Sequence, residues 1–429
     1  MRSEDLMGTS APQPTAWTAG ARPLRPFPTD RPARAVIVGA GGMGTWWSKV
    51  VVASDVAELV GVADLDESAP ARVLAESGIA DPGSVATGTD GVELALATEA
   101  DILINPTVPV AHHPVTVRAL HAGIPVLGEK PVTETLPEAL SLLAHAQTTG
   151  VPFMISQSRR FFPQVRQLRG FLAEFGPTVL TSAFFSLFTE HGGFRSTQQH
   201  PLLRDMGIHA FDTARYITGT DPVAVTAHGT NPPWSVYAGD GTVSCTFEMV
   251  RAGGRENPVE PEHSLFVYNG TWNARGLGTY WNSEWRLGAE HGSATWDGRG
   301  APRFGAEEGP RPGTDNADAG LDADRAERLA VLQAEADAPH DDEPNQIDAS
   351  LIEFVTALRE DRRPLSEVHE NILSFAMVEA AVTSVDRGTR VEIDPLLEAA
   401  RDQAIAAETD EQARAVLQSW SSVREALAG

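Results

Sequence analysis

The 429-residue sequence is short of cysteine and lysine, and it has no long apolar run. Its one cysteine, Cys245, excludes an internal disulfide and any cysteine-rich metal site. No stretch approaches the roughly 20 apolar residues that a membrane-spanning helix needs. The 33 basic residues face 58 acidic ones, and the net charge of −25 would repel nucleic acid and anionic membrane surfaces. We therefore expect neither nucleic acid nor a membrane as a partner.

Lysine is so rare that only Lys49 and Lys130 occur among the 33 basic side chains. An arginine keeps its proton at any working pH, whereas a lysine beside another cation can be tuned toward neutrality and take part in proton transfer. Lys130 follows an apolar run and precedes Pro131, so we expect it at the carboxyl end of a parallel strand, where open sheets bind ligands. The proline restricts the backbone before it and permits a cis bond. A solvated lysine at a strand end is the alternative.

The order of segments predicts an α/β Rossmann domain followed by an α+β domain with a mostly antiparallel open sheet. Short β-branched runs alternate with helical stretches in the first part, whereas strands follow one another across glycine and proline turns in the second. The expected strands are 35–38, 58–63, 101–105, 124–128, 151–156, 178–188, 223–228, 242–250, 262–268, 284–287 and 391–393. The expected helices are 114–122, 135–149, 203–218, 348–360 and 367–388.

These patterns suggest four regions. We expect a flexible arm over residues 1–30, the Rossmann domain over 31–156, a substrate-binding and oligomerisation domain over 157–395, and a helical tail over 396–429. An acidic stretch over about 301–347 is expected to be a surface insertion or loop. The first 30 residues are rich in proline and lack the apolar core of a secretory signal, so we expect a cytoplasmic protein.

The first strand runs into Gly39-Ala40-Gly41-Gly42-Met43-Gly44, which satisfies the Gly-x-Gly-x-x-Gly pattern. Glycines at these places allow a tight turn, close approach of the backbone to a pyrophosphate, and close contact between helix and strand. The helix that begins there offers free backbone amides to phosphates. Asp64 follows the second strand. A carboxylate at this place accepts hydrogen bonds from the ribose hydroxyls of NAD and repels the extra phosphate of NADP. NAD is the expected cofactor, and a glycine turn in another open sheet is the alternative.

Asp205 and His209 are four residues apart on the expected helix 203–218, so their side chains should lie over one another with Cβ atoms about 5 to 6 Å apart. A carboxylate beside an imidazole orients the ring and stabilises its protonated form, as a general acid or base requires. A lone histidine on a helix is more often an ordinary surface or core residue. The pair is a candidate for catalysis.

Aromatic and arginine side chains are candidates for substrate contacts. Several aromatic residues lie close together in the sequence, and their flat faces could pack against the C–H groups of a sugar. Trp272 is the member that we expect to contact the substrate. The alternative is that these residues are core residues, as tryptophans on a sheet more often are. The group consists of Trp272, Tyr280, Trp281 and Trp285. For Arg159 and Arg160 we consider two alternatives: contact with the substrate, or ion pairs with acidic residues on the surface.

Together the motifs resemble the Gfo/Idh/MocA oxidoreductases, the family of glucose-fructose oxidoreductase and inositol dehydrogenase. The resemblance covers about 35–393 without the acidic insertion. The matching segments are the glycine loop, Asn105-Pro106-Thr107, His112, 119–123, Glu129-Lys130-Pro131, Arg159-Arg160-Phe161, 205–212, 351–354, 363–366 and 388–391.

The resemblance implies an NAD-dependent enzyme that oxidises a secondary alcohol of a sugar, sugar derivative or cyclitol, with Lys130, Asp205 and His209 as catalytic residues and without a metal. It also implies a homo-oligomer, a dimer or tetramer. The implied cofactor contacts are the glycine loop with Met43, Asp64, Asn105, Pro106, Thr107, His112, Glu129 and Lys130. The implied substrate contacts are Lys130, Arg159, Arg160, Asp205 and His209.

One departure concerns the residues before Asp205. Many members have a glycine-rich run there, whereas this chain has His200-Pro201-Leu202-Leu203-Arg204, which leaves the substrate open. Two other functions stay open as well. One is a non-catalytic NAD-linked sugar sensor, and the other is an enzyme that retains NAD and cleaves glycosidic bonds through transient oxidation.

Overall fold

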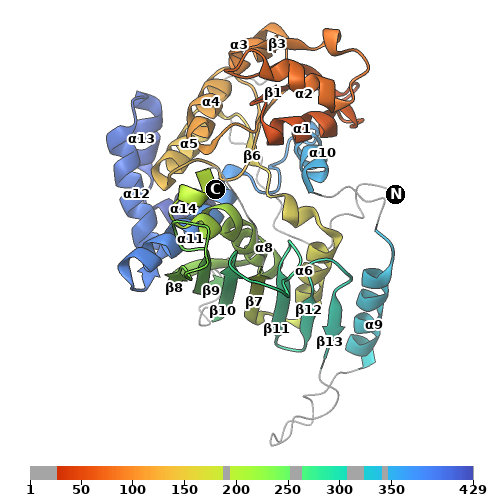
Figure 1. The fold of residues 1–429 in the computed structure, drawn as a ribbon, viewed down its shortest axis with the longest axis vertical. Helices are drawn as coiled ribbons and strands as arrows, with labels where there is room; N and C mark the ends of the chain where they lie inside the picture. Colours follow the sequence, from red (N-terminus) through yellow and green to blue (C-terminus); the bar gives the residue numbers. More distant parts are fainter. Residues whose placement is uncertain (1–26, 187–193, 252–262, 307–322, 341–345, 429) are drawn as a thin grey trace, which may run out of the picture. The chain divides into compact units, whose positions relative to one another are not determined.

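The chain folds into two compact units (Figure 1). Unit 1 comprises Met1–Ser158, Pro344–Phe375 and Leu397–Gly429, and unit 2 comprises Arg159–Glu343 and Ala376–Leu396. The computed structural model describes residues 27–186, 194–251, 263–306, 323–340 and 346–428. The expected second domain was drawn as one continuous stretch, so the assignment of 344–375 to unit 1 corrects it. Most of the expected N-terminal arm and part of the acidic insertion lie outside the described residues.

Unit 1 contains a six-stranded parallel sheet in the order β3-β2-β1-β4-β5-β6. This is the order of the doubly wound dinucleotide-binding fold, and the connections change direction between β1 and β4. The strands are β1 (Ala33–Val38), β2 (Ala57–Ala63), β3 (Ala86–Gly88), β4 (Ile102–Asn105), β5 (Val126–Gly128) and β6 (Phe153–Ile155). Helices cover both faces, which explains why β4 and β5 are buried along their whole length and read as continuous apolar runs. The predicted Rossmann fold is confirmed.

Helices α5, α10 and α11 begin and end within two residues of the predicted bounds, whereas α4 begins at Pro109 rather than at Pro114, and α2 and α3 were not predicted. Helix α5 starts with the predicted capping box, in which the Thr135 side chain accepts a hydrogen bond from the Glu138 backbone and the Glu138 carboxylate accepts one from the Thr135 backbone. The early helices are α1 (Gly42–Val52), α2 (Ala69–Ser77), α3 (Gly91–Ala97), α4 (Pro109–His121) and α5 (Leu136–Thr149). The later ones are α10 (Gln346–Arg359), α13 (Glu411–Ser419) and α14 (Val423–Ala428). Helices α11 (Val368–Arg387) and α12 (Ile393–Ala407) each have residues in both units. Within the described residues, no helix has both the length and the apolar character to cross a membrane.

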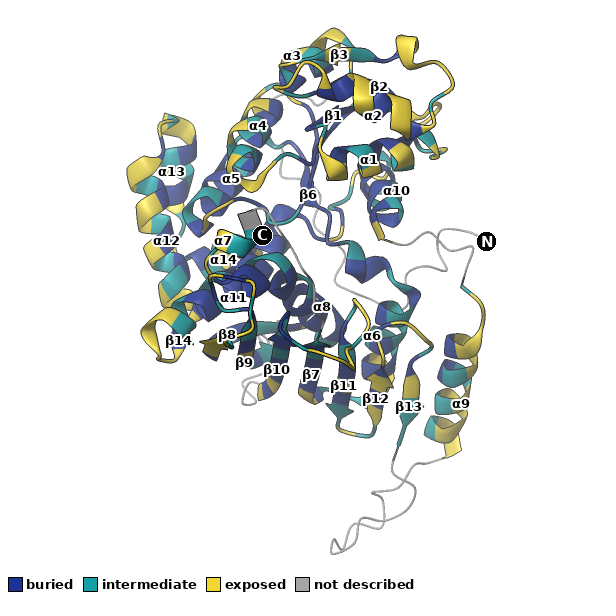
Figure 2. Ribbon diagram, viewed as in Figure 1, coloured by how far each residue is buried: buried dark blue, intermediate teal, exposed yellow. Residues whose placement is uncertain are grey.

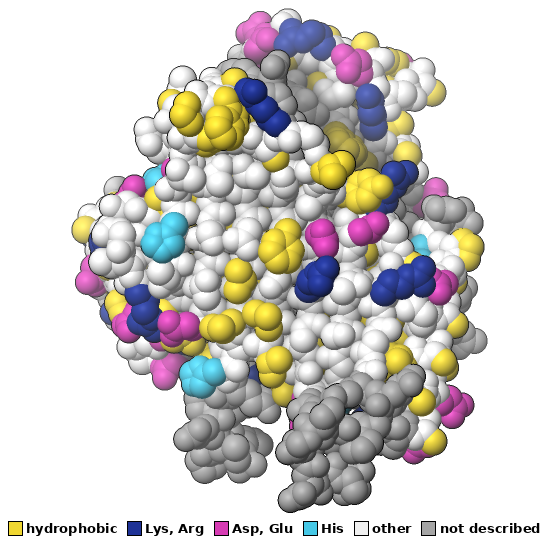
Figure 3. Space-filling model, turned by 60° about the horizontal axis from the view of Figure 1, so that its bottom comes forward, with side chains coloured by type: hydrophobic (Ala, Val, Ile, Leu, Met, Phe, Trp, Pro, Cys, Tyr) yellow, Lys and Arg dark blue, Asp and Glu magenta, His cyan; other side chains and the backbone are white. Residues whose placement is uncertain are grey.

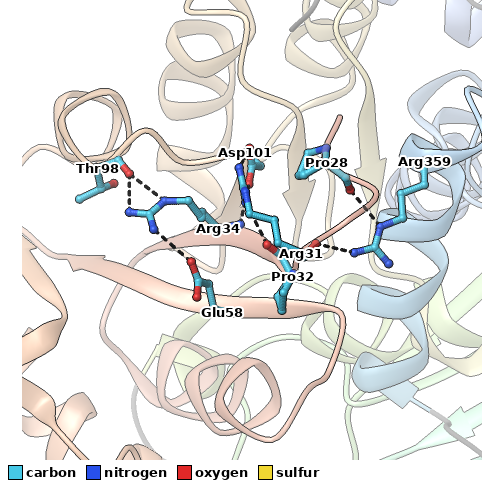
Figure 4. A network of polar contacts seen from close by, with 8 residues as sticks. All are labelled: Pro28, Arg31, Pro32, Arg34, Glu58, Thr98, Asp101 and Arg359. Atoms are coloured by element: carbon cyan, nitrogen blue, oxygen red, sulfur yellow. Dashed lines mark hydrogen bonds and ion pairs between the residues drawn. The ribbon is translucent and has the colours of Figure 1, made fainter. Parts of the chain in front are cut away.

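The beginning of the described chain is held on unit 1 by polar contacts (Figure 4). The Arg31 guanidinium donates two hydrogen bonds to the Asp101 carboxylate, at 2.6 and 3.1 Å. The Arg34 backbone amide donates to the same carboxylate at 2.7 Å. From α10, Arg359 donates to the carbonyl oxygens of Pro28 and Arg31 at 3.1 and 3.0 Å. Pro28, which lies in the expected flexible arm, is therefore hydrogen-bonded to α10.

Unit 2 is built on an eight-stranded sheet in the order β13-β12-β11-β7-β10-β9-β8-β14. Its pairs are antiparallel except for the parallel pair β7 and β10, so the predicted mostly antiparallel sheet is confirmed. The strands are β7 (Thr178–Ser186), β8 (Thr220–Thr230), β9 (Thr242–Arg251), β10 (His263–Thr271), β11 (Glu284–Ala289), β12 (Ser293–Trp296), β13 (Arg303–Gly305) and β14 (Val391–Glu392). Helices α6 (Pro163–Phe175) and α8 (Ile208–Thr218) pack against the sheet, and the residues between them and the strands are buried (Figure 2).

The described part of the acidic stretch contains regular secondary structure, which agrees with the expected surface insertion and not with the alternative, a loop. It contains β13 and helix α9 (Ala323–Asp337). The two are joined by an ion pair between Arg303 and Asp337 at 3.1 Å and by a hydrogen bond from the Phe304 amide to the Gln333 side chain at 3.2 Å. The acidic composition therefore reflects a solvated helix face in this stretch.

Candidate active site

The glycine loop of unit 1 is closed on one side and open on the other. A Cβ atom at Gly44 would lie 1.9 Å from the Gly39 carbonyl oxygen, and one at Gly39 would lie 3.0 Å from the Thr107 backbone. Gly39 also has a φ of +111°, a conformation that favours glycine. By contrast, a Cβ atom at Gly41 or Gly42 would meet no atom within 4 Å. The loop thus packs tightly on the sheet and leaves free space at the start of α1, which fits a pyrophosphate.

Asp64 ends β2 beside this loop, as predicted. One carboxylate oxygen accepts a hydrogen bond from the Ala40 amide at 2.6 Å, and the other accepts one from the Asp66 amide at 2.9 Å. The carboxylate is therefore held in place next to the open side of the loop. The arrangement fits the adenosine ribose of NAD, whose hydroxyls an acid at this place accepts.

Three further predicted cofactor residues form a polar network behind the loop. Asn105 and His112 are buried, and the side-chain amide oxygen of Asn105 accepts a hydrogen bond from the Thr107 hydroxyl at 2.7 Å. The His112 ring nitrogens lie 2.7 Å from the Pro131 carbonyl oxygen and 3.0 Å from that of Thr107. Burial lowers the pKa of His112, although these carbonyl contacts oppose the shift. The network ties the turn after β4 to the turn after β5, so Asn105 and His112 act as supports, and Thr107 is the member that reaches the surface.

Lys130 stands at the carboxyl end of β5, as predicted, and the Lys130–Pro131 peptide bond is cis. Its neighbour Glu129 is buried and accepts hydrogen bonds from the Trp47 indole at 2.9 Å and from the Lys130 amide at 3.1 Å. Burial raises the pKa of Glu129, while the bond from Trp47 and the charge of Lys130 oppose that shift. Glu129, predicted to contact the cofactor, therefore anchors the backbone of Lys130 to α1.

In unit 2, Asp205 lies on a π-helical turn, Leu203–Gly207, that runs directly into α8. π-Helical turns within helices frequently occur at functional sites. Asp205 therefore lies on a wider π turn and His209 on α8, whereas we expected both on one regular α-helix. The Asp205 carboxylate accepts hydrogen bonds from the Arg195 guanidinium at 2.9 and 3.3 Å. No sequence pattern pointed to Arg195, because the contact joins a short helix (Phe194–Thr197) to the π turn.

The residues that replace the family's glycine-rich run are engaged in ion pairs. His200 has a φ of +50°, and its ring nitrogens lie 2.7 Å from an Asp240 oxygen and 3.1 Å from an Asp386 oxygen. The contact with Asp240 raises the pKa of His200. Arg204 pairs with Glu379 at 2.7 Å. The contacts of His200 and Arg204 hold the start of the helix that carries Asp205.

The two neighbouring arginines have different surroundings. Arg160 is fully buried and donates two hydrogen bonds to Asp212, at 2.7 and 2.6 Å. Its predicted substrate contact is therefore wrong, because the pair belongs to the interior. Arg159 is 7% exposed and donates to the Trp281 carbonyl oxygen at 3.2 Å. Burial lowers the pKa of Arg159 to about 10, against opposing contributions from Tyr268 and Asp205.

The aromatic group divides into core and surface members. Trp272 and Trp285 are 0% and 1% exposed, and Trp272 packs against Tyr237 with ring centroids 5.2 Å apart. The predicted substrate contact of Trp272 is thus wrong, and its indole belongs to the core. Tyr280 and Trp281, in the turn before β11, are 46% and 48% exposed. They are the members with exposed surface, although the Arg299 guanidinium lies over the Tyr280 ring at 5.3 Å from its centroid.

The structure thus gathers the predicted residues into two groups. The glycine loop, Asp64, the Asn105 network and Lys130 meet at the carboxyl edge of the sheet in unit 1. Asp205, His209 and Arg159 belong to unit 2. The expectation that Lys130 and His209 share one substrate joins the two units and stays a prediction.

Comparison with known proteins agrees with this geometry. Residues 33–157 match the model of an oxidoreductase family with an NAD-binding Rossmann fold, GFO_IDH_MocA. The rhizopine catabolism protein MocA of Rhizobium meliloti is 32% identical over 193 residues, which are 44% of this chain and 58% of that protein. An inositol 2-dehydrogenase of Rhizobium meliloti is 30% identical over 201 residues, 44% of this chain and 56% of that protein. The chain therefore spans less than three fifths of the length of these relatives.

A solved structure shows the same fold over most of the chain. It is an oxidoreductase from Agrobacterium radiobacter in complex with NAD+, L-tartaric acid and magnesium. The TM-score is 0.67 at 16% identity, and the match covers 85% of this chain and 99% of that one. At this identity the likeness concerns the fold, and it includes both units.

Proposed function

We propose that the chain is an NAD-dependent dehydrogenase of the Gfo/Idh/MocA type, acting on a secondary alcohol of a sugar, sugar derivative or cyclitol. The match of residues 33–157 to the family model and the similarity to MocA and inositol 2-dehydrogenase support this proposal. The observation that carries the proposal is the edge of the parallel sheet in unit 1. There an open glycine loop, a fixed carboxylate at Asp64 and the strand-end Lys130 stand together. NAD is the cofactor that this edge fits.

In the proposed reaction, His209, Lys130 and Asp205 have separate roles. The glycine loop and Asp64 would hold NAD, which would supply the acceptor for the hydride from the carbon that bears the hydroxyl. His209 takes the hydroxyl proton, and the Lys130 ammonium donates a hydrogen bond to the same oxygen. Asp205, held by Arg195, orients the imidazole. The hydride and the proton together account for the two electrons and two hydrogens that leave the alcohol when it becomes a carbonyl.

The test is NADH formation with a panel of sugars and inositols. A positioned general base contributes about 10² to 10⁴ in rate, so His209→Gln should lower kcat by that factor. Lys130→Arg keeps the charge but removes a group that can exchange its proton, so it should also lower kcat. Lys49→Arg is the matched control, because the chain's other lysine is exposed on α1.

The same assay separates the other functions. A dehydrogenase accumulates NADH, and a sensor binds the sugar without forming it. An enzyme that recycles NAD cleaves a glycoside without net NADH. Normal turnover by Lys130→Arg with every substrate would refute the role given to Lys130.

We also propose a cytoplasmic homo-oligomer that associates through unit 2. Along β10, buried residues alternate with half-buried or exposed ones, so one face of this strand is open. Leu265, which is 45% exposed, lies on the open face. On the face shown in Figure 3, hydrophobic side chains form several small groups among other side chains and backbone atoms. Light scattering after size-exclusion chromatography measures the subunit number, and a monomer at micromolar concentration would contradict the proposal. Its one cysteine, Cys245, is buried, which suits a reducing compartment.

A further inference from the structure

Arg159 is a buried cation whose charge is not balanced nearby. It lies on the turn Ser158–Phe161, and its side chain is 7% exposed. Its neighbour Arg160 has Asp212 as a counter-ion at 2.6 Å. Among the residues that the structure describes, no carboxylate lies within ion-pair distance of Arg159. Its guanidinium, which has five N–H donors, makes one hydrogen bond there, to the Trp281 carbonyl oxygen at 3.2 Å.

A buried charge is costly unless it is paired and hydrogen-bonded. The acid that influences Arg159 is Asp205, which acts from beyond ion-pair distance and already accepts two hydrogen bonds from Arg195. The Arg195–Asp205 pair is neutral as a pair, so the charge of Arg159 is left over. Burial lowers the pKa of Arg159 to about 10, because the cost of burying the charge exceeds the stabilisation of that charge by Tyr268 and Asp205. An arriving anion would supply the missing partner.

We propose that the substrate is an acidic carbohydrate whose carboxylate binds Arg159. The planar guanidinium fits the two oxygens of a carboxylate through parallel hydrogen bonds. Arg159 donates its hydrogen bond to the backbone carbonyl oxygen of Trp281. Trp281 and its neighbour in the chain, Tyr280, are both about half exposed. Aromatic faces suit the C–H groups of a sugar ring. A sugar acid therefore matches both features, whereas a neutral polyol leaves the cation unpaired.

This inference names the substrate class of the proposed dehydrogenase, and it rests on that function only in treating the ligand as a substrate. Binding can therefore be tested apart from turnover. We would measure calorimetric dissociation constants for two matched pairs, D-glucuronate with D-glucose and D-galacturonate with D-galactose, with and without NAD. The proteins are the wild type, Arg159→Gln, Arg159→Lys and the control Arg286→Gln. Arg286 carries the same charge on β11 but is 66% exposed.

We expect at least one uronate to bind about 10- to 150-fold more tightly than its neutral partner, as a hydrogen-bonded charge pair typically provides. Arg159→Gln should abolish this preference, Arg159→Lys should keep part of it, and Arg286→Gln should leave it unchanged. Circular dichroism confirms the fold of each variant, and Arg159→Lys decides the matter if Arg159→Gln does not fold.

Equal affinity within both pairs, absence of uronate binding, or a preference that survives in a folded Arg159 variant without loss would overturn the inference. The proposed function fails differently. A uronate that binds through Arg159 but never reduces NAD supports the binding site and refutes the dehydrogenase. Oxidation of a neutral sugar without any acidic preference supports the dehydrogenase and refutes the inference.

Discussion

Replacement of His200 by asparagine tests the ionic contacts that fix the start of the Asp205 helix. His200 contacts Asp240 at 2.7 Å and Asp386 at 3.1 Å, and its carbonyl accepts a hydrogen bond from the Arg204 amide at 3.1 Å. Its φ is +50°, a conformation that asparagine adopts more readily than most residues. The substitution therefore removes the charge with little added backbone strain.

The size of the effect follows from the exposure of the two acids. The Asp240 side chain is 12% exposed, so its contact with protonated His200 is expected to stabilise the fold by about 1.5 to 3 kcal/mol. The Asp386 side chain is 63% exposed, and solvent screening reduces its contact to about 0 to 1 kcal/mol. We expect His200→Asn to lower the free energy of unfolding by about 2 to 3 kcal/mol when His200 carries its proton.

The sign of the pH dependence follows from the pKa of His200. The Asp240 contact raises this pKa above the ordinary value of 6.5, so the folded protein holds the proton more tightly than the unfolded chain. The stabilisation is fully present below the unfolded pKa and is lost as the pH rises through the folded pKa. The difference between wild type and variant should thus be largest near about pH 6 and fall below roughly 1 kcal/mol near about pH 9.

Urea unfolding followed by tryptophan fluorescence at both pH values measures this difference. His263→Gln is the control, because His263 is exposed at the start of β10 and its removal should change stability little at either pH. A difference between wild type and His200→Asn that is the same at both pH values would refute the ionic account. A variant as stable as the wild type at the lower pH would refute it as well.

Three other substitutions test the cofactor edge and the core. Gly44→Ala should abolish NAD binding measured by calorimetry, because the new Cβ would lie 1.9 Å from the Gly39 carbonyl oxygen. Asp64→Ala should weaken NAD binding by about 10-fold or more and narrow the preference for NAD over NADP, since the carboxylate and its bond to the loop are lost; unchanged affinities for both would contradict this. Asp212→Asn should lower the free energy of unfolding by about 3 to 5 kcal/mol, because Arg160 is then buried without its counter-ion. Replacing both partners by Met and Leu should recover much of that loss, and no recovery would show that the pair itself stabilises the fold.

Local sequence patterns were sufficient for most of unit 1. Most of its strands are buried and appear as apolar runs, and the capping box of α5 is a local signal. The edge strand β3 has the sequence Ala-Thr-Gly, is not buried, and was not predicted because it contains no apolar run. The arrangement of unit 2 depends on contacts between distant segments. Nothing in the sequence shows that β7 and β10 pair in parallel, because the pairing joins strands that are far apart in the chain. The same holds for α10, whose place in unit 1 follows from packing rather than from its own residues.

The site shows the same division. The glycine loop, Asp64 and Lys130 were predictable because each follows directly from the end of a strand. The aromatic group was not, because Trp272 and Trp281 are chemically alike and only the packing decides that one is buried and the other half exposed. Likewise, the sequence shows two adjacent arginines, and the difference between Arg159 and Arg160 arises from Asp212, which lies on α8. Burial and partners, rather than residue type, assign these roles.

The division of unit 1 into three chain segments has a consequence for how the protein is made. Helix α13 packs on α5, the Trp420 indole donates a hydrogen bond to Gln147 at 3.0 Å, and Ser141 donates one to Glu408 at 2.5 Å. These partners leave the ribosome far apart in time, because all of Arg159–Leu396 is synthesised between them; at about 5 to 20 residues per second, the delay is roughly 10 to 50 s. During that interval the apolar side of α5 is exposed, because α13 has not yet been synthesised. A nascent chain of this protein is therefore expected to need a holding chaperone until translation is nearly complete, and truncation before α13 would leave an aggregation-prone Rossmann domain.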